Sequence, residues 1–479
     1  MTSWSLLKLA AAILPVLHLL GALAASEVLL YARSPQGAIA WCLFLVVFPY
    51  LGLPIYMIFG RSKFKGYRER IARVVEHQNR DLEWYRQQLL GSTKMPEDPD
   101  PARRDAFSKI ANAEFLGGNE VTLLVDGQAT FDAIFAEVDR ASSFILMEFF
   151  IIKEDELGLE LQQRLVAAAE RGVSVRVLYD EVGTHRLSRK FLGTFADAGI
   201  EVRSFGTRRG GLRNFFQINF RNHRKIVVVD GQVGFIGGHN VGDEYVGRST
   251  EFGHWRDTHI RISGPAALHL KRIFFADWVW ATGAPPNISL SAPVPAGDIT
   301  MLTLAFGPAS DLDACTLFFL HAISSARSRI WIATPYFIPD DALLCALQLA
   351  AMRGVDVRVL VPAKRDHMLV WLASFFFVPA AATTGVKAYR YTDGFLHQKV
   401  LVLDDLYAAV GSANFDNRSF RLNFEATSLV ADRGFNQQVA EMLERDMASA
   451  TDVSNERMSD FPLWKRLGSR FARLFSPIL

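Results

Sequence analysis

The sequence predicts an α/β fold made of two similar tandem halves, in which helices cover a sheet, preceded by an N-terminal hairpin of two transmembrane helices. Two observations lead to this prediction. A pattern of strand, helix, strand, helix and strand occurs twice between residues 105 and 450, and two long apolar runs lie within residues 1–60. Alternation of strands and helices is typical of α/β proteins.

The composition is that of a folded protein. Of the 479 residues, 50% are hydrophobic and 21% are charged, which excludes a disordered or low-complexity chain. Lys and Arg number 52 against 50 Asp and Glu, so a globally basic nucleic-acid binder is not indicated. Cys42, Cys315 and Cys345 have no paired spacing, which argues against a disulfide framework or a cysteine-based zinc site.

Residues 1–60 are predicted to form two transmembrane helices. Gly37 to Phe59 contains no charged residue and is long enough to cross a hydrocarbon core of ~30 Å. We expect Pro49 and Pro54 to kink this helix without excluding it. Leu9 to Ala25 is the other apolar run, for which a cleaved signal peptide is the alternative interpretation.

The charges around the apolar runs predict the orientation. Residues 61–73 contain six basic residues and one acidic residue, whereas the loop between the runs carries only Glu27 and Arg33. Under the positive-inside rule, everything after residue 60 lies on the cytoplasmic side of the membrane. We therefore expect a multi-pass membrane protein in which residues 61–104 form a basic juxtamembrane helix and a linker.

The chain after this linker repeats itself. R-G-V-S-V-R-V-L at 171–178 returns as R-G-V-D-V-R-V-L at 353–360, each after an apolar helical pattern. A stretch rich in Pro, Ala, Gly and Ser at 281–298 is typical of a joint between halves. We predict one domain over 105–290 and a second over 291–450. Further matching strands are expected at 143–152 and 328–339, and at 199–205 and 385–391.

One set of polar and glycine positions recurs at a constant offset. The first copy is His223, Lys225, Asp230, Gly237 and Asn240, and the second copy is His397, Lys399, Asp404, Gly411 and Asn414. Five matches at one offset are too many for coincidence. A lone core histidine would have no reason to recur together with its lysine and asparagine, so we take these residues as a functional site.

The spacing within the motif predicts which way the side chains face. His and Lys two residues apart on a strand point to the same face. If the strand runs through unbroken, Asp230 and Asp404 point to the opposite face, where they would close a turn before Gly231 or Asp405. We nevertheless keep all six His, Lys and Asp residues of the two copies as the candidate catalytic set.

Two copies of His, Lys and Asn suit chemistry at phosphorus. Two histidines can divide the roles of nucleophile and general acid. Two lysines and two asparagines can hold a dianionic, five-coordinate phosphorus by charge and by amide donors. We expect no metal and no cofactor, because the sequence contains no H-E-x-x-H, P-loop or dinucleotide fingerprint. A composite site of this kind requires both halves.

The double motif H-x-K-x4-D-x6-G-[GS]-x-N resembles that of the phospholipase D superfamily. Within it, the chain resembles the bacterial cardiolipin synthases through Y-M-I-F-G-R at the end of the N-terminal hairpin, W-R-D-T-H-I-R-I-S-G-P at 255–265 and T-P-Y-F-I-P-D at 334–340. The resemblance covers essentially the whole chain. It implies two phospholipase D-like domains around one pseudo-two-fold active site, in the inner membrane of a bacterium.

The resemblance implies transfer of a phosphatidyl group between two phosphatidylglycerol molecules, which gives cardiolipin and glycerol through a phosphohistidine. His223 would be the nucleophile and His397 the general acid and then the base, an order that the near-equivalent motifs leave open. Phosphate would be bound by Lys225, Lys399, Asn240 and Asn414. A phospholipase that uses water and a membrane-tethered nuclease share these residues. The hairpin favours phosphatidylglycerol and anionic lipid as partners over nucleic acid, while phosphatidylethanolamine remains a possible acceptor.

The resemblance also implies an acidic residue that orients each histidine. Glu425, in N-F-E-A-T-S-L-V, fits this role in the second half. Spacing alone favours Glu251 in the first half. We choose Asp257, in R-D-T-H-I-R-I, because the flanking strand pattern matches, and this choice requires a six-residue insertion. Gly238 is a departure, since it stands where the family usually has serine.

Two further segments have two interpretations each. The stretch before His223 is longer than its counterpart and is either a membrane-contacting loop or an ordinary solvated insertion; it contains Arg208, Arg209, Arg213, Phe215 and Phe216. Within the predicted tail, 451–479, residues 464–479 carry four basic residues and no acidic one. Apolar residues at helical spacing make this tail either a surface helix on anionic lipid or a final helix docked on the domain; they are Leu463, Leu467, Phe471 and Leu474.

Overall fold

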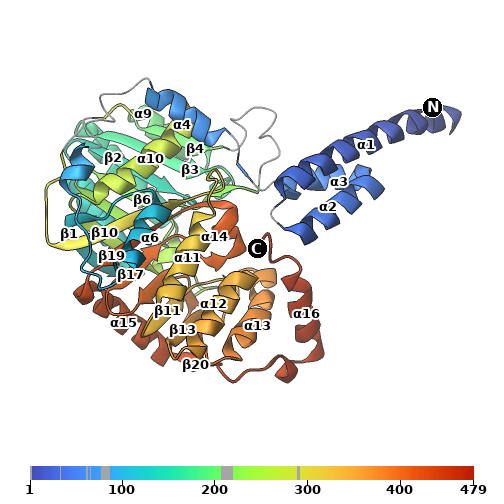
Figure 1. The fold of residues 1–479 in the computed structure, drawn as a ribbon. Coiled ribbons are helices and arrows are strands. Elements are labelled where there is room, and N and C mark those ends of the chain that lie inside the picture. Colours follow the sequence, from blue (N-terminus) through green and yellow to red (C-terminus); the bar gives the residue numbers. More distant parts are fainter. Residues whose placement is uncertain are drawn as a thin grey trace. The chain divides into compact units, whose positions relative to one another are not determined.

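The computed structural model describes residues 3–32, 34–60, 63–64, 66–76, 87–206, 219–288 and 292–479 (Figure 1). The chain forms two compact units, which are described separately. The first comprises residues 1–67 and 207–220, and the second comprises residues 68–206 and 221–479. The basic and aromatic residues predicted to form a loop before His223 lie outside the described residues, so both interpretations of that loop remain predictions.

The first unit contains a helical hairpin. Its first arm is α1 (Ser3–Tyr31), within which Ala12–Tyr31 is long and apolar enough to cross a membrane; no other described helix meets both conditions. The second arm consists of α2 (Pro35–Val47), α3 (Pro49–Ile55) and a π-helical turn (Tyr56–Gly60). The N-terminal apolar helix that the sequence predicts is therefore present, and it is longer than the apolar run from which it was predicted.

The predicted helix from Gly37 to Phe59 is interrupted at Pro49, the first of the two prolines expected to kink it. The helix stops at Phe48, whose φ of −128° and ψ of 58° lie outside the helical region. The cause is Pro49, which has no N–H to donate and whose ring disfavours the helical conformation of the residue before it. Pro54, by contrast, lies inside α3 without ending it.

Gly21 allows the two arms of the hairpin to approach closely. A Cβ atom on Gly21 of α1 would lie 2.3 Å from the carbonyl oxygen of Leu45 on α2. Within the second arm, a Cβ atom on Gly52 would lie 3.0 Å from the carbonyl oxygen of Phe44. Large apolar side chains such as Leu30, which is 75% exposed, point outward instead. Small residues between helices and apolar residues outside are the arrangement found in membrane helices.

The second unit is built on one 16-stranded mixed sheet covered by helices (Figure 1). In the first half the strands follow the order β4-β3-β2-β6-β7-β9-β1, and in the second half the order β14-β13-β11-β16-β17-β19-β10. The two orders match strand for strand, and antiparallel pairing of β1 with β10 joins the halves. The first-half strands are β1 (Leu116–Val125), β2 (Phe144–Phe149), β3 (Ser174–Asp180), β4 (Glu201–Phe205), β6 (Ile226–Val229), β7 (Val233–Gly237) and β9 (Thr258–Ser263). The second-half strands are β10 (Ile299–Phe306), β11 (Arg329–Ala333), β13 (Asp356–Pro362), β14 (Lys387–Tyr391), β16 (Val400–Leu403), β17 (Tyr407–Gly411) and β19 (Asn423–Ala431), with β20 (Ala450–Asp452) added at the edge.

The repeated R-G-V sequence ends a helix in the same way in both halves. Gly172 and Gly354 have φ values of 90° and 86°, a left-handed conformation that favours glycine. The next residue, a valine, then donates its N–H back to the last turn of α8 (Glu156–Glu170) or α12 (Asp341–Met352).

The α/β prediction is confirmed. The remaining long helices are α6 (Pro101–Ala111), α7 (Asp126–Arg140), α9 (Arg189–Asp197), α10 (Ala267–Thr282), α11 (Ala314–Ser325), α13 (Met368–Ala382) and α15 (Arg433–Ala448), besides α4 (Tyr67–Glu76).

Helix α6 contains residue 105, the predicted start of the first domain, yet it packs on the second half. The Phe107 ring lies 5.7 Å from that of Phe318 on α11 and 5.5 Å from that of Tyr407 on β17. The other predicted boundary, at residue 290, lies among residues outside the described part of the chain. The domain limits therefore remain predictions, while the two halves form a single unit.

Candidate active site

The chain crosses between the halves just before each motif histidine. Strand β5 (Arg221–Asn222), which precedes His223, pairs in parallel with the beginning of β19 in the second half. Strand β15 (Phe395–Leu396), which precedes His397, pairs in the same way with β8 (Trp255–Arg256) of the first half. The strand therefore does not run unbroken through either motif. It ends just before each histidine, because the chain then changes from a partner strand in the other half to a partner strand in its own half.

The backbone at each histidine is bonded to the opposite half. The N–H of His223 donates to the carbonyl of Phe424 at 2.9 Å, and the N–H of His397 donates to the carbonyl of Arg256 at 2.8 Å. The residues that follow these two carbonyls are Glu425 and Asp257. The pairing therefore places one carboxylate beside each histidine.

Each imidazole is held by a carboxylate of the other half. Nδ1 of His223 lies 2.9 Å from Oε1 of Glu425, and Nδ1 of His397 lies 2.6 Å from Oδ2 of Asp257. Both carboxylates are fully buried, whereas the two histidine side chains are 12% and 10% exposed. We assign the Nδ1 proton to this bond in each ring, which leaves Nε2 as the nitrogen available for chemistry.

Glu425 is held as a charged carboxylate. It accepts hydrogen bonds from Ser412 Oγ at 2.5 Å, Ser419 Oγ at 3.0 Å and Asn423 Nδ2 at 3.1 Å. Burial would raise the pKa of Glu425, but His223, Lys225 and the Ser412 hydroxyl together hold that pKa below its ordinary value. A carboxylate that stays ionised next to His223 favours positive charge on that ring.

Asp257 occupies the same register position as Glu425. Gly237 pairs with His259 and Gly411 pairs with Thr427, so each acid lies two residues before the partner of the motif glycine. Glu251, the residue that spacing alone favoured, is exposed in the preceding turn. The register therefore favours Asp257 over Glu251 as the counterpart of Glu425.

Gly238 leaves the space that the Asp257 carboxylate fills. A Cβ atom at Gly238 would lie 2.1 Å from Oδ1 of Asp257, which also accepts a hydrogen bond from the N–H of Thr258 at 2.8 Å. In the second half the equivalent residue is Ser412, whose hydroxyl instead donates to Glu425. The absence of serine in the first motif thus has a steric reason.

The two motif lysines carry buried amines at the same site. Nζ of Lys225 donates to the carbonyl of His223 at 2.6 Å, and Lys399 contacts the carbonyl of His397 in the same way. Burial lowers the pKa of Lys225 to about 7 and that of Lys399 to about 8. Burial also lowers the pKa of His223 to about 4, with a further contribution from Lys225 and Lys399. Burial therefore favours neutral imidazoles.

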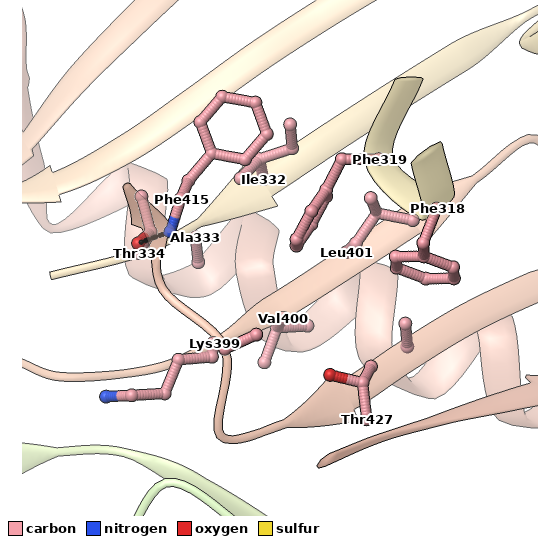
Figure 2. Close-up of a pocket in the computed structure, with 12 residues that line it drawn as sticks. Phe318, Phe319, Ile332, Ala333, Thr334, Lys399, Val400, Leu401, Phe415 and Thr427 are labelled. Atoms are coloured by element: carbon pink, nitrogen blue, oxygen red, sulfur yellow. Dashed lines mark hydrogen bonds between the residues drawn. The ribbon is translucent and has the colours of Figure 1, made fainter. Parts of the chain in front are cut away.

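Lys399 lies at the edge of a small pocket lined mainly by apolar side chains (Figure 2). Leu401 and the rings of Phe318 and Phe319 line the small pocket beside it, and Figure 2 shows the ammonium group pointing away from these rings. The lowered pKa of Lys399 therefore comes from burial of the amine itself and not from contact with these rings.

The two motif asparagines are bonded differently. Oδ1 of Asn240 accepts a hydrogen bond from the N–H of Ile151 at 3.1 Å, and its Nδ2 donates to the Tyr245 hydroxyl at 3.1 Å. Oδ1 of Asn414 is buried and has no hydrogen-bond partner among the described residues. Asn240 is thus fixed within the first half, whereas Oδ1 of Asn414 is left as an acceptor for a donor group of a ligand.

Asp230 and Asp404 lie away from the histidines, at the far ends of β6 and β16. Asp230 has φ 52° and accepts backbone N–H groups of Ser142, Ser143 and Phe144. Asp404 has φ 50° and accepts the corresponding amides at the start of β11, together with Arg103 at 2.6 Å. We therefore remove both aspartates from the candidate catalytic set, because strands β6 and β16 separate them from it.

Two arginine–aspartate pairs that the sequence analysis missed connect the site to two helices. Arg224 lies 2.5 Å from Asp277 of α10 and donates from Nε to the carbonyl of Glu425 at 3.1 Å. Arg256 makes two 2.8 Å bonds to Asp446 of α15. The sequence contained a signal for both pairs, because an aspartate lies on the mainly apolar inner side of α10 and of α15. Only the fold shows which arginine each aspartate contacts.

Aromatic rings flank both histidines. Phe150 lies 5.1 Å from the His223 ring, and Trp255 and Tyr245 lie 5.1 and 6.3 Å from the His397 ring. The aromatic neighbour of His223 is thus apolar, whereas Tyr245, whose hydroxyl accepts a hydrogen bond from Asn240, lies on the side at His397.

Restoring the family's serine by Gly238→Ser should impair this chain. The new Cβ would displace the Asp257 carboxylate from His397, and we expect a roughly hundredfold loss of turnover, the order of magnitude for a small misplacement of a catalytic group. Turnover and the thermal unfolding midpoint would be measured together. Gly193→Ser on α9, where a Cβ meets nothing within 4 Å, is the matched control. Full activity of Gly238→Ser would contradict the steric explanation.

Comparisons with known proteins agree with the double motif. A protein-family model described as "Cardiolipin synthase, PLD-like domain" matches residues 134–278 and 319–447, and one described as "Phospholipase D-nuclease N-terminal" matches residues 19–61. The solved phosphatidylserine synthase of Haemophilus influenzae Rd KW20 covers 79% of this chain and 100% of its own at a TM-score of 0.59. Because the two sequences are only 15% identical, that likeness concerns the fold alone.

Curated relatives match along nearly the full length. Cardiolipin synthase A of Pseudomonas putida (strain GB-1) is 48% identical over 471 residues, which is 98% of each chain. Cardiolipin synthase A of Pseudomonas fluorescens (strain SBW25) is 46% identical over 466 residues, which is 97% of each chain. With its two interlocked halves and its double histidine motif, this chain belongs to the bacterial cardiolipin synthase family of the phospholipase D superfamily.

Proposed function

We propose that this chain transfers a phosphatidyl group from one phosphatidylglycerol to a glycerol hydroxyl of another, which forms cardiolipin and releases glycerol. The observation that carries this proposal is the pair of histidines, each bonded at Nδ1 to a carboxylate of the other half. Such a pair supplies a nucleophile and a proton carrier at one site. The names of the full-length relatives support the lipid substrate and the synthetic direction.

In the first step, Nε2 of His223 attacks the phosphorus of a bound phosphatidylglycerol. The phosphorus–oxygen bond to the headgroup glycerol breaks, and glycerol leaves with a proton from Nε2 of His397. His223 must be neutral to attack, and its lowered pKa favours the neutral ring. The arriving phosphate charge favours protonation of His397, which must be charged to donate.

In the second step, a hydroxyl of a second phosphatidylglycerol attacks the phosphorus of phosphatidyl-His223. That hydroxyl gives its proton to Nε2 of His397, the phosphorus–nitrogen bond breaks, and cardiolipin leaves with both histidines restored. We assign His223 as the nucleophile because Glu425, held ionised by two hydroxyls and an amide, stabilises the positive ring of a phosphohistidine. Lys225 and Lys399 hold the phosphoryl oxygens, and Asn414 supplies an amide.

Position in the membrane is part of the proposal. We propose that the hairpin crosses the membrane twice and that the catalytic unit lies on the cytoplasmic side, with no nucleic-acid substrate. The apolar α1 and the outward-facing leucines of the hairpin support the insertion. The basic residues over 61–73 support the orientation.

Product analysis tests the proposed function. Purified full-length enzyme with phosphatidylglycerol in mixed micelles should release glycerol and form cardiolipin in equal amounts. His223→Ala and His397→Ala should each reduce turnover by at least ~10³-fold, since each removes an essential group. Phosphatidic acid as the dominant product would indicate a hydrolase and would contradict the synthase proposal. Substantial activity in either variant would contradict the two-histidine mechanism.

The lowered lysine pKa values predict a pH effect on anion binding. Sulfate keeps a constant charge near neutral pH, so its competitive inhibition constant reports the charge of the site. As pH rises through about 7 and 8, Lys225 and Lys399 lose their protons. Inhibition should therefore weaken from pH 7 upward, by about tenfold per pH unit for each lysine that has deprotonated. An inhibition constant that stays flat to pH 9 would show that both lysines have ordinary pKa values.

A further inference from the structure

The C-terminal helix α16 (Leu463–Arg473) docks on the catalytic unit through its small residues. Ser469 and Ala472 are buried, and a Cβ atom on Gly468 would lie 3.5 Å from Leu372 of α13. Nζ of Lys465 lies 3.3 Å from the centre of the Phe375 ring on the same helix. The docked-helix interpretation of the tail is therefore confirmed by these contacts.

The large apolar residues of this segment face away from the domain. They are Leu463, Trp464, Leu467, Phe471 and Leu474, and their exposed fractions run from 57% to 73%. Such a row of leucine and aromatic side chains on one surface is unusual for a protein in water, and it marks an interaction site. Because α16 is already packed on α13, its apolar stripe is not simply a core face that lacks a partner.

Basic residues accompany the apolar stripe. Arg466, Arg470 and Arg473 belong to the same helix, and residues 464–479 contain no acidic residue. A helix with leucine and aromatic side chains on one side and arginines beside them is typical of helices that lie in the interface of an anionic membrane. Trp464 is the kind of side chain that favours the headgroup level.

The end of the tail is bonded to a short helix that contacts the active site. The carbonyl of Leu479 accepts the N–H of Arg418, at 2.9 Å, on α14 (Asn417–Arg421), and Figure 1 shows the C-terminus beside this helix. On the same helix, Ser419 donates its hydroxyl to Glu425 at 3.0 Å. The segment that carries the apolar stripe therefore ends one short helix away from the carboxylate that holds His223.

We propose that the outer face of α16, formed by Leu463, Trp464, Leu467, Phe471 and Leu474, docks on the anionic surface of the membrane. This contact is separate from the hairpin. It holds the catalytic unit against the bilayer that contains the lipid substrate, so its catalytic role rests on the proposed function. The occupant is the lipid interface, since arginines complement anionic headgroups and the apolar row matches the depth of the acyl boundary.

Quenching of tryptophan fluorescence measures this contact directly. Full-length enzyme is placed in nanodiscs that contain phosphatidylglycerol and a lipid with brominated acyl chains. The Trp464 contribution is the difference between the wild type and Trp464→Phe. We expect this contribution to be strongly quenched. Leu467→Ser with Phe471→Ser should abolish most of the quenching, and Arg466→Gln with Arg470→Gln should reduce the docked population on the order of tenfold or more.

Matched controls remove exposed side chains elsewhere. Leu349→Ser with Met352→Ser on α12 removes two apolar side chains that are 57% and 68% exposed. Arg189→Gln with Lys190→Gln removes two exposed basic residues on α9. Neither control should change the quenching of Trp464. All four double variants should keep the wild-type unfolding midpoint, since the altered side chains are exposed apart from the half-buried Arg466.

Several outcomes would overturn the proposal. One is an equal loss of fluorescence by quenching in the wild type and in Trp464→Phe, because Trp464 would then contribute nothing to the quenched signal. Another is an oligomer in detergent that dissociates only in Leu467→Ser with Phe471→Ser, which would assign the stripe to a second copy of the chain. Turnover gives an independent reading: the same variant should lose activity on bilayers and keep it on dispersed short-chain phosphatidylglycerol. An enzyme with quenched Trp464 but no cardiolipin product would refute the proposed function and leave the docking surface in place.

Discussion

The bond between each motif histidine and a carboxylate of the opposite half is the interaction on which the catalytic unit depends. Glu425 can reach His223 only because β5 leaves its own half and pairs with β19, and Asp257 reaches His397 only because β15 pairs with β8. These crossings require the halves to join edge to edge, as β1 and β10 do. Neither half alone contains both a motif histidine and the carboxylate bonded to it, which explains why both copies of the motif are needed in one active unit.

Burial of the site concentrates its electrostatic effects. Two lysines and two histidines share a volume closed by two carboxylates, and the low-dielectric surroundings lower the pKa of the cations while the carboxylates oppose this effect. A site of this kind has its positive charge poorly solvated until an anion arrives. A phosphodiester then gains the interactions that water does not supply, which is the arrangement expected for stabilising charge at phosphorus.

The sequence predicted the features that local chemistry determines. Helix ends at Gly172 and Gly354, the strands around them and the two histidine–lysine pairs follow from short patterns and a constant offset. A kink at Pro49 was expected, whereas the structure has a full break at Phe48, because the sequence does not show how far one missing backbone hydrogen bond disrupts a helix. Which carboxylate serves which histidine could not be predicted, since the two pairings join residues 202 and 140 positions apart through strands of only two residues.

The central claim, that each histidine is oriented by the other half, can be tested by ¹⁵N NMR of the histidine side chains. The full-length protein would be compared with Glu425→Gln and Asp257→Asn, after assignment by His223→Asn and His397→Asn. The account predicts that Glu425→Gln changes the tautomer and pKa of His223 and leaves His397 in its wild-type tautomer, while Asp257→Asn does the reverse. Coupling within one half, with Glu425→Gln acting on His397 and Asp257→Asn acting on His223, would contradict it.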